Sequence, residues 1–301
     1  MIKGISMKKI WINKKYICRL ACKWTAGVFT MLGFVGTFAS LNDILPCEWK
    51  ILFKLLLSLG ILCGTWGISF VACAIWFSNK KRISIFEANN GCHVYVEYGD
   101  ILSDNIIEVP KSRRNIVIGV NRCFDTIIDN DLVSDRSLHG LVFKRMYKKG
   151  IYDENTLNEA IQKDLVIRQN LKSALLSRKD KRRGNLKRYD VGTVAEVKAS
   201  QYCTYFCLGL SIYDYDLSAC TSQQEYVLAM QKLIEYCHAR SQGDPVIMPL
   251  IGAGLSKTKN DEKSILEFLV KLFKLNKDLI VSDIHIVIRD SGKGTIPITE
   301  L

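Results

Sequence analysis

The hydrophobic pattern divides the chain at about residue 82. Before this point, residues 24–41 and 55–77 are apolar or small and contain no charged side chain. Each stretch has about the ~20 residues that a helix needs to cross the hydrocarbon core of a bilayer. The pattern predicts a hairpin of two transmembrane helices, and a pair of buried core helices is the alternative.

After residue 82, short strand-like runs alternate with amphipathic helical stretches. Strands are predicted at residues 83–86, 92–98, 115–121, 191–197, 202–211, 245–251 and 283–289. Helices are predicted at residues 137–149, 155–178, 222–239 and up to residue 273, with Ser134 or Asp135 capping the first of them. This alternation predicts a three-layer α/β/α domain at residues 83–301, built around a mixed, mostly parallel sheet.

Positive charge is concentrated in the first part of the chain. Residues 1–82 carry twelve basic and two acidic side chains, which is +10 of the total net charge of +12. Basic residues precede the first apolar stretch and follow the second. The positive-inside rule therefore predicts two spans with both termini in the cytoplasm. The flanking cations would meet anionic lipid, whereas the remaining +2 argues against a nucleic-acid partner.

One local run of charge stands out in the second part. The basic segment, residues 178–188, reads Arg-Lys-Asp-Lys-Arg-Arg-Gly-Asn-Leu-Lys-Arg. Such a run is typical of a solvated or lipid-facing loop, and contact with RNA is the minor alternative.

Cysteine and histidine patterns predict neither a metal site nor a catalytic set. Eleven cysteines are present, but none forms a Cys-x-x-Cys pair, and a cytoplasmic location would keep them reduced. The four histidines are more typical of core or surface positions. His139 is the exception, because it lies beside the expected ligand loop and is a possible ligand contact.

A glycine turn follows the strand at residues 245–251. Gly252, Ala253, Gly254 and Leu255 would bring backbone N–H groups close to an anion, and the following helix adds its positive dipole end. The turn lacks the Gly-Lys-Ser/Thr ending of a P-loop, which argues against a nucleoside triphosphatase. A phosphate site and a plain strand-to-helix turn both remain open from this local pattern.

The ends of the other strands indicate where a ligand would bind. In sheets of this class, ligands bind at the carboxyl ends of the parallel strands. The loops concerned begin at Gly99, Asn121, Tyr213, Gly252 and Arg289.

Four motifs, in this order, resemble the macro domain family. They are Gly99-Asp100-Ile101, the strand ending at Asn121, Gly192-Thr193-Val194, and Pro249-Leu-Ile-Gly-Ala-Gly-Leu255. The resemblance covers residues 92–289 and implies binding of ADP-ribose or a related nucleotide. It implies that Asp100 accepts from the adenine amino group, that Asn121 contacts the distal ribose, and that residues 252–255 surround the diphosphate.

Two departures from the macro pattern alter the expected chemistry. The usual glycine triplet is replaced by residues 133–140, where Arg136 is expected to pair with phosphate and Ser134 or Ser137 to supply hydroxyls. The usual second asparagine is also absent. Both changes weaken the case for ADP-ribosyl hydrolysis and favour ligand binding without catalysis, metal or cofactor.

The whole arrangement resembles the transmembrane-macro effectors of Thoeris anti-phage systems. The resemblance implies an inner-membrane protein that senses histidine-ADP-ribose made by a TIR-domain partner. It further implies that the effector forms a homo-oligomer, disrupts the membrane and causes abortive infection. A membrane-tethered ADP-ribosyl hydrolase and a tethered ADP-ribose-binding scaffold are the alternatives.

Overall fold

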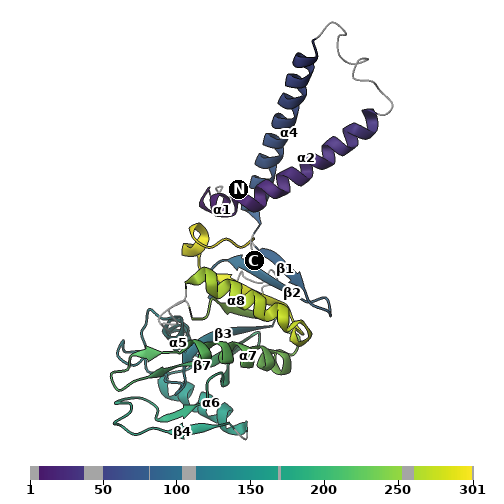
Figure 1. Cartoon of the computed structure of the whole chain (residues 1–301). Helices are drawn as coiled ribbons and strands as arrows, with labels where there is room; N and C mark the ends of the chain where they lie inside the picture. Colours follow the sequence, from purple (N-terminus) through teal and green to yellow (C-terminus); the bar gives the residue numbers. More distant parts are fainter. Residues whose placement is uncertain are drawn as a thin grey trace. The chain divides into compact units, whose positions relative to one another are not determined.

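The computed structural model describes residues 7–36, 50–80, 82–103, 113–168, 171–252 and 261–299. Their contacts define two compact units (Figure 1). The helical unit contains the described residues up to Lys80 together with residues 293–299, and the sheet unit contains residues 82–292. The second domain predicted from sequence, residues 83–301, also includes residues 293–299, which contact the helical unit.

The helical unit has three described helices, α1 (Met7–Ile12), α2 (Lys14–Gly36) and α4 (Ile51–Asn79). Helix α4 is long and apolar enough to cross a membrane, and most of its large apolar side chains are exposed. It is the one described helix that meets this criterion. Of the predicted span at 24–41, residues 24–36 lie in α2 and the rest lie outside the described residues. The span at residues 24–41 therefore stays a prediction.

The C-terminal residues pack within the helical unit. Asn13 is buried, and its Oδ1 accepts hydrogen bonds from the Ile298 backbone N–H at 2.9 Å and from the Thr299 hydroxyl at 3.0 Å. Its Nδ2 donates to the Lys9 carbonyl at 2.9 Å. Ile298 is fully buried. These bonds fix the end of the chain to the turn between α1 and α2.

The sheet unit is built on one mixed sheet. Its strand order is β1 (Arg82–Glu87), β2 (His93–Tyr98), β10 (Ile284–Ile288), β9 (Val246–Pro249), β3 (Arg114–Asn121), β7 (Cys203–Tyr213) and β6 (Val194–Ser200), with β8 (Ala219–Cys220) on β7. The pairs from β2 through β10, β9 and β3 to β7 are parallel. The outer pairs β1–β2, β6–β7 and β7–β8 are antiparallel.

Helices cover both faces of this sheet. On β7, Tyr205 and Cys207 join the apolar cluster that includes residues of α5 (Leu138–Lys148) and α6 (Glu154–Ile167). Phe206 points the other way and contacts Tyr236 of α7 (Gln223–Arg240) edge to face. Helix α8 (Glu262–Leu275) packs beside α7 through Phe268 and Tyr226. Because successive strand residues face opposite sides, these contacts confirm the predicted three-layer α/β/α arrangement.

One predicted helix is too long. The helix expected at residues 155–178 ends at Ile167, and β4 (Ser173–Leu175) pairs with β5 (Lys187–Tyr189) instead. Leu171 still packs against the core, but Leu175 is 84% exposed. The apolar spacing that suggested one continuous helix face therefore belongs to two elements. Pairing between β4 and β5 satisfies backbone N–H and C=O groups that would otherwise bond within a longer helix.

Candidate functional site

A cavity of about 240 Å³ lies where four neighbouring strands of the sheet end. The ends of β2, β10 and β9 line it, together with Gly119 of β3 and the first turns of α5 and α8. Its walls are formed by Gly99, Asp100, Ile101, Leu102, Gly119, Arg136, Ser137, Leu138, His139, Leu141, Pro249, Leu250, Ile251, Gly252, Glu262, Val287, Ile288, Arg289 and Gly292. The position agrees with the general rule for ligand sites in such sheets.

Half of the predicted ligand-binding residues meet in this cavity. They are Asp100, Ile101, Arg136, Ser137 and Gly252. Asn121 and Ser134 are not among the residues that line it. Ala253, Gly254 and Leu255 lie outside the described residues. Ligand contacts at all ten positions stay predictions.

The end of β2 forms the wall that carries Asp100. The Gly99 N–H still belongs to the sheet, since it donates to the Ile288 carbonyl at 2.9 Å. The Asp100 carboxylate then accepts from the Leu102 N–H at 3.0 Å and closes a tight turn. Ile101 is buried and anchors this turn in the core. The exposed carboxylate of Asp100 is thereby held at the cavity on a fixed backbone.

The first turn of α5 forms the second wall. Ser137 caps this helix, because its hydroxyl accepts from the Gly140 N–H at 3.0 Å and donates to the Ser134 carbonyl at 2.6 Å. The expectation that Ser134 or Asp135 caps the helix is wrong, since the chain turns through these residues before the helix begins. The Ser134 hydroxyl accepts from the Arg136 N–H instead. The Arg136 side chain is exposed at the cavity, so this turn brings a positive charge to the cavity wall.

His139 is a cavity residue whose ring is buried. Its Nε2 has no hydrogen-bond partner among the described residues, and the Phe143 ring packs edge to face against it at 4.5 Å. Burial lowers the pKa of His139 to about 4, with an opposing effect from the Asp125 backbone. The imidazole is therefore neutral at pH 7. The sequence singled out this histidine, and the structure places it in the cavity wall.

The ends of β9 and β10 complete the site. Gly252 has a φ of +93°, a conformation that glycine adopts readily and other residues rarely do. The Tyr226 hydroxyl donates to the Ile251 carbonyl at 2.9 Å and holds this strand end in place. Arg289 follows β10 and brings a second cation to the cavity. It lies at one of the predicted strand ends, whereas the loop at Tyr213 does not reach the cavity lining.

Asn121 does not line the cavity. It is buried, and its Oδ1 accepts from the N–H groups of Cys123 at 3.0 Å and Asp125 at 3.4 Å. Burial and the Asp125 carboxylate raise the pKa of Tyr213 to about 12, and the Asn121 side chain opposes this shift. In this structure Asn121 therefore organises the turn that leaves β3.

Glu262 and Gly292 are cavity residues that the sequence analysis did not select. Glu262 begins α8 after the capping residue Asp261, a position that looks like ordinary helix chemistry in sequence. Gly292 lies in the short helix η2 (Asp290–Gly294). Neither residue carries a sequence signal that separates it from a helix start or a turn.

The buried histidine makes stability depend on pH. Because the pKa of His139 is lower in the folded chain than the ordinary 6.5, the unfolded chain binds more protons between pH 6.5 and 4. The contribution of His139 to the free energy of unfolding is therefore fully present above pH 6.5 and is lost as the pH falls towards 4. Between pH 7 and pH 5 we expect His139 to account for a loss of about 2 kcal/mol. Denaturant unfolding of wild type and His139→Gln, followed by circular dichroism, measures this difference, and parallel pH profiles would contradict it.

Comparison with known proteins adds independent information. Residues 94–289 match the family model described as Thoeris protein ThsA, Macro domain. Thoeris protein ThsA of Bacillus amyloliquefaciens (strain Y2) is 24% identical over 252 residues, which cover 82% of this chain and 75% of that protein. Two solved structures of Bacteroides thetaiotaomicron proteins, one described as being of unknown function, align with 64% and 66% of this chain and 97% and 99% of their own. Their identities to this chain are 12% and 13%, with TM-scores of 0.36 and 0.39.

Proposed function

We propose a sensory function in anti-phage defence for this chain, which belongs to the family of the Thoeris ThsA macro domain. Family membership supports an anti-phage role and the binding of an ADP-ribose-related ligand. The observation that carries the proposal is the cavity at the strand ends. It combines the carboxylate of Asp100, the cations of Arg136 and Arg289, and a glycine-lined backbone.

The cavity chemistry suits the parts of ADP-ribose. In the proposed complex, Asp100 accepts from the adenine amino group, and Arg136 and Arg289 pair with the diphosphate. The presence of all three residues in the cavity lining and the open backbone at Gly252 support this proposal. The ligand proposed is an ADP-ribose derivative, with histidine-ADP-ribose made by a TIR-domain partner as the specific candidate.

A binding function is favoured over hydrolysis by the residues that follow Asn121. Arg122 turns away to Glu225 at 2.9 Å and to the Tyr189 carbonyl at 2.8 Å. Cys123 is buried, and burial raises the pKa of its thiol, which disfavours the reactive thiolate. Within the described residues, no cluster of His, Cys, Asp or Glu is arranged to hold a metal ion.

The helical unit supports a membrane location. The exposed apolar surface of α4 suits a bilayer better than water. At its end, the Lys80 ammonium lies 4.3 Å from the Trp76 ring centroid, as expected for an interfacial anchor. We propose that residues 24–41 form a second span, that both termini are cytoplasmic, and that the chain resides in the inner membrane as a homo-oligomer.

Ligand binding is proposed to reach the helices through the end of the chain. Arg289 and Gly292 line the cavity, and residues 293–299 belong to the helical unit through Asn13. The chain therefore leaves the cavity and enters the helical unit within a few residues. Suppose that each arrangement of residues 289–292 goes with one conformation of the helical unit. A ligand that binds one arrangement more tightly then shifts the helical unit towards the matching conformation, by at most the difference in its binding free energy for the two states. Assembly of the spans, membrane disruption and abortive infection are the proposed outcome.

Calorimetry and leakage together test this function. Wild-type protein in lipid nanodiscs is expected to bind ADP-ribose and, more tightly, histidine-ADP-ribose. In dye-loaded liposomes, the same ligand should release dye only when the protein is present. Absence of binding for both ligands would refute the sensor. Binding without leakage would instead favour a scaffold, and release of ADP-ribose from a modified protein would favour a hydrolase.

Arg136 provides a graded test of the cavity. Arg136→Gln removes one charge-assisted hydrogen bond to phosphate, worth about 1.5–3 kcal/mol. The Kd for ADP-ribose should rise by about 10- to 100-fold. Lys148→Gln, exposed at the far end of α5, is the matched control and should leave the Kd unchanged. Equal Kd values for both variants, measured by calorimetry, would place the phosphates elsewhere.

A further inference from the structure

The basic segment, residues 178–188, contacts the residues that follow β3 through a buried lysine. Lys181 is fully buried, and its ammonium contacts the carboxylate of Asp125, which is 1% exposed. Lysine is almost never fully buried unless it is paired. The expectation of a solvated or lipid-facing loop is therefore wrong for this residue, since the charge pattern could not show an acidic partner 56 positions earlier.

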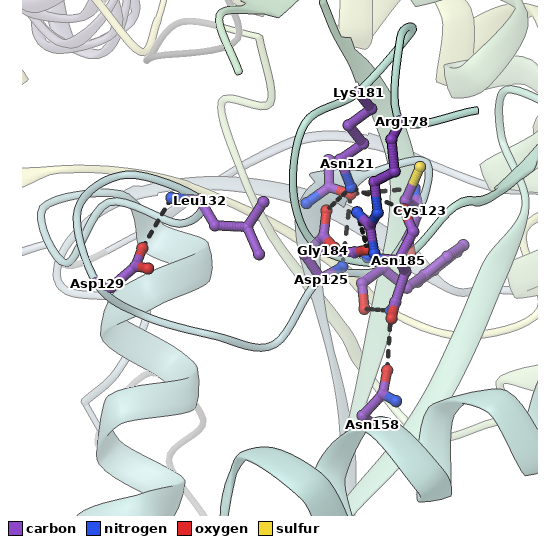
Figure 2. A network of polar contacts seen from close by, with 11 residues as sticks. Asn121, Cys123, Asp125, Asp129, Leu132, Asn158, Arg178, Lys181, Gly184 and Asn185 are labelled. Atoms are coloured by element: carbon purple, nitrogen blue, oxygen red, sulfur yellow. Dashed lines mark hydrogen bonds and ion pairs between the residues drawn. The ribbon is translucent and has the colours of Figure 1, made fainter. Parts of the chain in front are cut away.

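A closed hydrogen-bond network surrounds this ion pair (Figure 2). Asp125 Oδ1 accepts from the Asn185 N–H at 2.7 Å, and the Lys181 ammonium donates to the Asn185 carbonyl at 2.9 Å. The Asn185 amide also donates to the carbonyl of Cys123 at 3.1 Å and to Asn158 Oδ1 at 2.8 Å. The basic segment thus satisfies polar backbone groups that follow β3, in the same turn whose N–H groups at Cys123 and Asp125 donate to Asn121.

Further ion pairs fasten the outer part of the segment. Arg183 lies 2.7 Å from Asp129 and 2.8 Å from Asp131, and Arg182 also pairs with Asp131. Gly184 has a φ of +77°, and a Cβ there would lie 2.2 Å from Asp125 Oδ1. Only glycine allows so close an approach. The contacts therefore run from residue 123 to residue 131 and include both buried and exposed charges.

The contacted residues belong to the β3–α5 loop (residues 122–137), which ends in the cavity wall. Arg136 and Ser137 lie at its end, and His139 follows in the first turn of α5. Burial lowers the pKa of His139, and a backbone hydrogen bond with Asp125 of the same loop opposes that shift. The loop has no regular secondary structure of its own, so its shape depends on what holds its first half.

We infer that the basic segment is a clasp that positions the β3–α5 loop for ligand binding, with Lys181 as the positioning residue. This inference rests on the proposed function, because the ligand is the one that the cavity binds. Lys181 touches no ligand and acts through Asp125. By linkage, a clasp that favours the binding-competent loop must itself be stabilised when ligand binds.

Hydrogen exchange of the full chain in nanodiscs, with and without saturating ADP-ribose, tests this linkage without any mutation. Exchange should slow in residues 134–140 and also in the basic segment. The exposed turn around Gly243 is the internal control and should not change. Protection of residues 134–140 alone would overturn the clasp and leave the sensor intact. No protection at either place would refute the proposed function, and the clasp with it.

A pair of variants supplies the second test. Lys181→Met leaves Asp125 without its cation and should raise the Kd for ADP-ribose at least tenfold, with loss of the ligand-induced protection of the basic segment. Lys187→Met removes an exposed charge of the same segment, whose ammonium lies 5.0 Å from the Tyr189 ring centroid. Its Kd should stay within twofold of wild type. Should Lys181→Met fail to fold, the wild-type exchange result decides, whereas a folded Lys181→Met with the wild-type Kd would overturn the inference.

Discussion

Replacing Gly252 by glutamate is expected to abolish binding of ADP-ribose. The position has a φ of +93°, so any side chain there strains the backbone at the end of β9. The residue also lines the cavity, where a new carboxylate would repel the diphosphate. Like charges brought together at an interface cost several kcal/mol. The Kd should therefore rise by about 100-fold or more, as measured by calorimetry on the protein in nanodiscs.

Gly243→Glu is the matched control for this substitution. Gly243 has a φ of +78° and so imposes a similar backbone strain, but a Cβ there meets nothing within 4 Å. It lies outside the cavity lining. Both variants should lose a similar small amount of thermal stability, and only Gly252→Glu should lose binding. Equal binding by the two variants would show that the end of β9 does not contact the ligand.

The sheet could be predicted from sequence because its strands carry their own signal. Residues 114–121 form a β-branched run buried on both faces, and β3 occupies nearly the predicted range. Helix α7 begins after Ser222, where a capping box is visible in the sequence as Ser222 and Glu225. Local rules suffice for these elements. They fail at residues 173–175, where pairing with β5 outweighs an apolar spacing that also fits a helix.

The candidate site was predictable to the extent that it follows from topology. Asp100, Gly252 and Arg289 each follow a parallel strand, and the sheet brings these three strand ends together. Asn121 also lies at a strand end, as the last residue of β3, yet it bonds to its own turn and does not line the cavity. Whether a side chain at a strand end faces the ligand or the loop depends on that loop's conformation. For the β3–α5 loop, partners in residues 178–188 contribute to the conformation, and no local pattern reveals them.

Replacing Asn13 by leucine is expected to separate ligand binding from the response of the helices. All five tryptophans lie in the first 76 residues, so their fluorescence reports on the helical unit and not on the sheet unit. Trp11 and Trp76 each lie beside a lysine, and the indole of Trp66 donates to Cys22 at 3.3 Å. A rearrangement of these helices would change the surroundings of their rings. Wild-type protein in nanodiscs should therefore show a saturable fluorescence change on titration with ADP-ribose.

Asn13→Leu should remove this change while saturable binding persists in calorimetry. The substitution leaves the buried N–H of Ile298 without its acceptor, a loss of about 1–3 kcal/mol that favours release of residues 293–299. Asn13→Asp is the intermediate variant, because a carboxylate oxygen still accepts from Ile298 and Thr299 but the donor to the Lys9 carbonyl is lost. It should retain part of the response. A full fluorescence change in Asn13→Leu would show that the signal reaches the helices by another route, of which the direct chain connection from α4 to β1 is the obvious candidate.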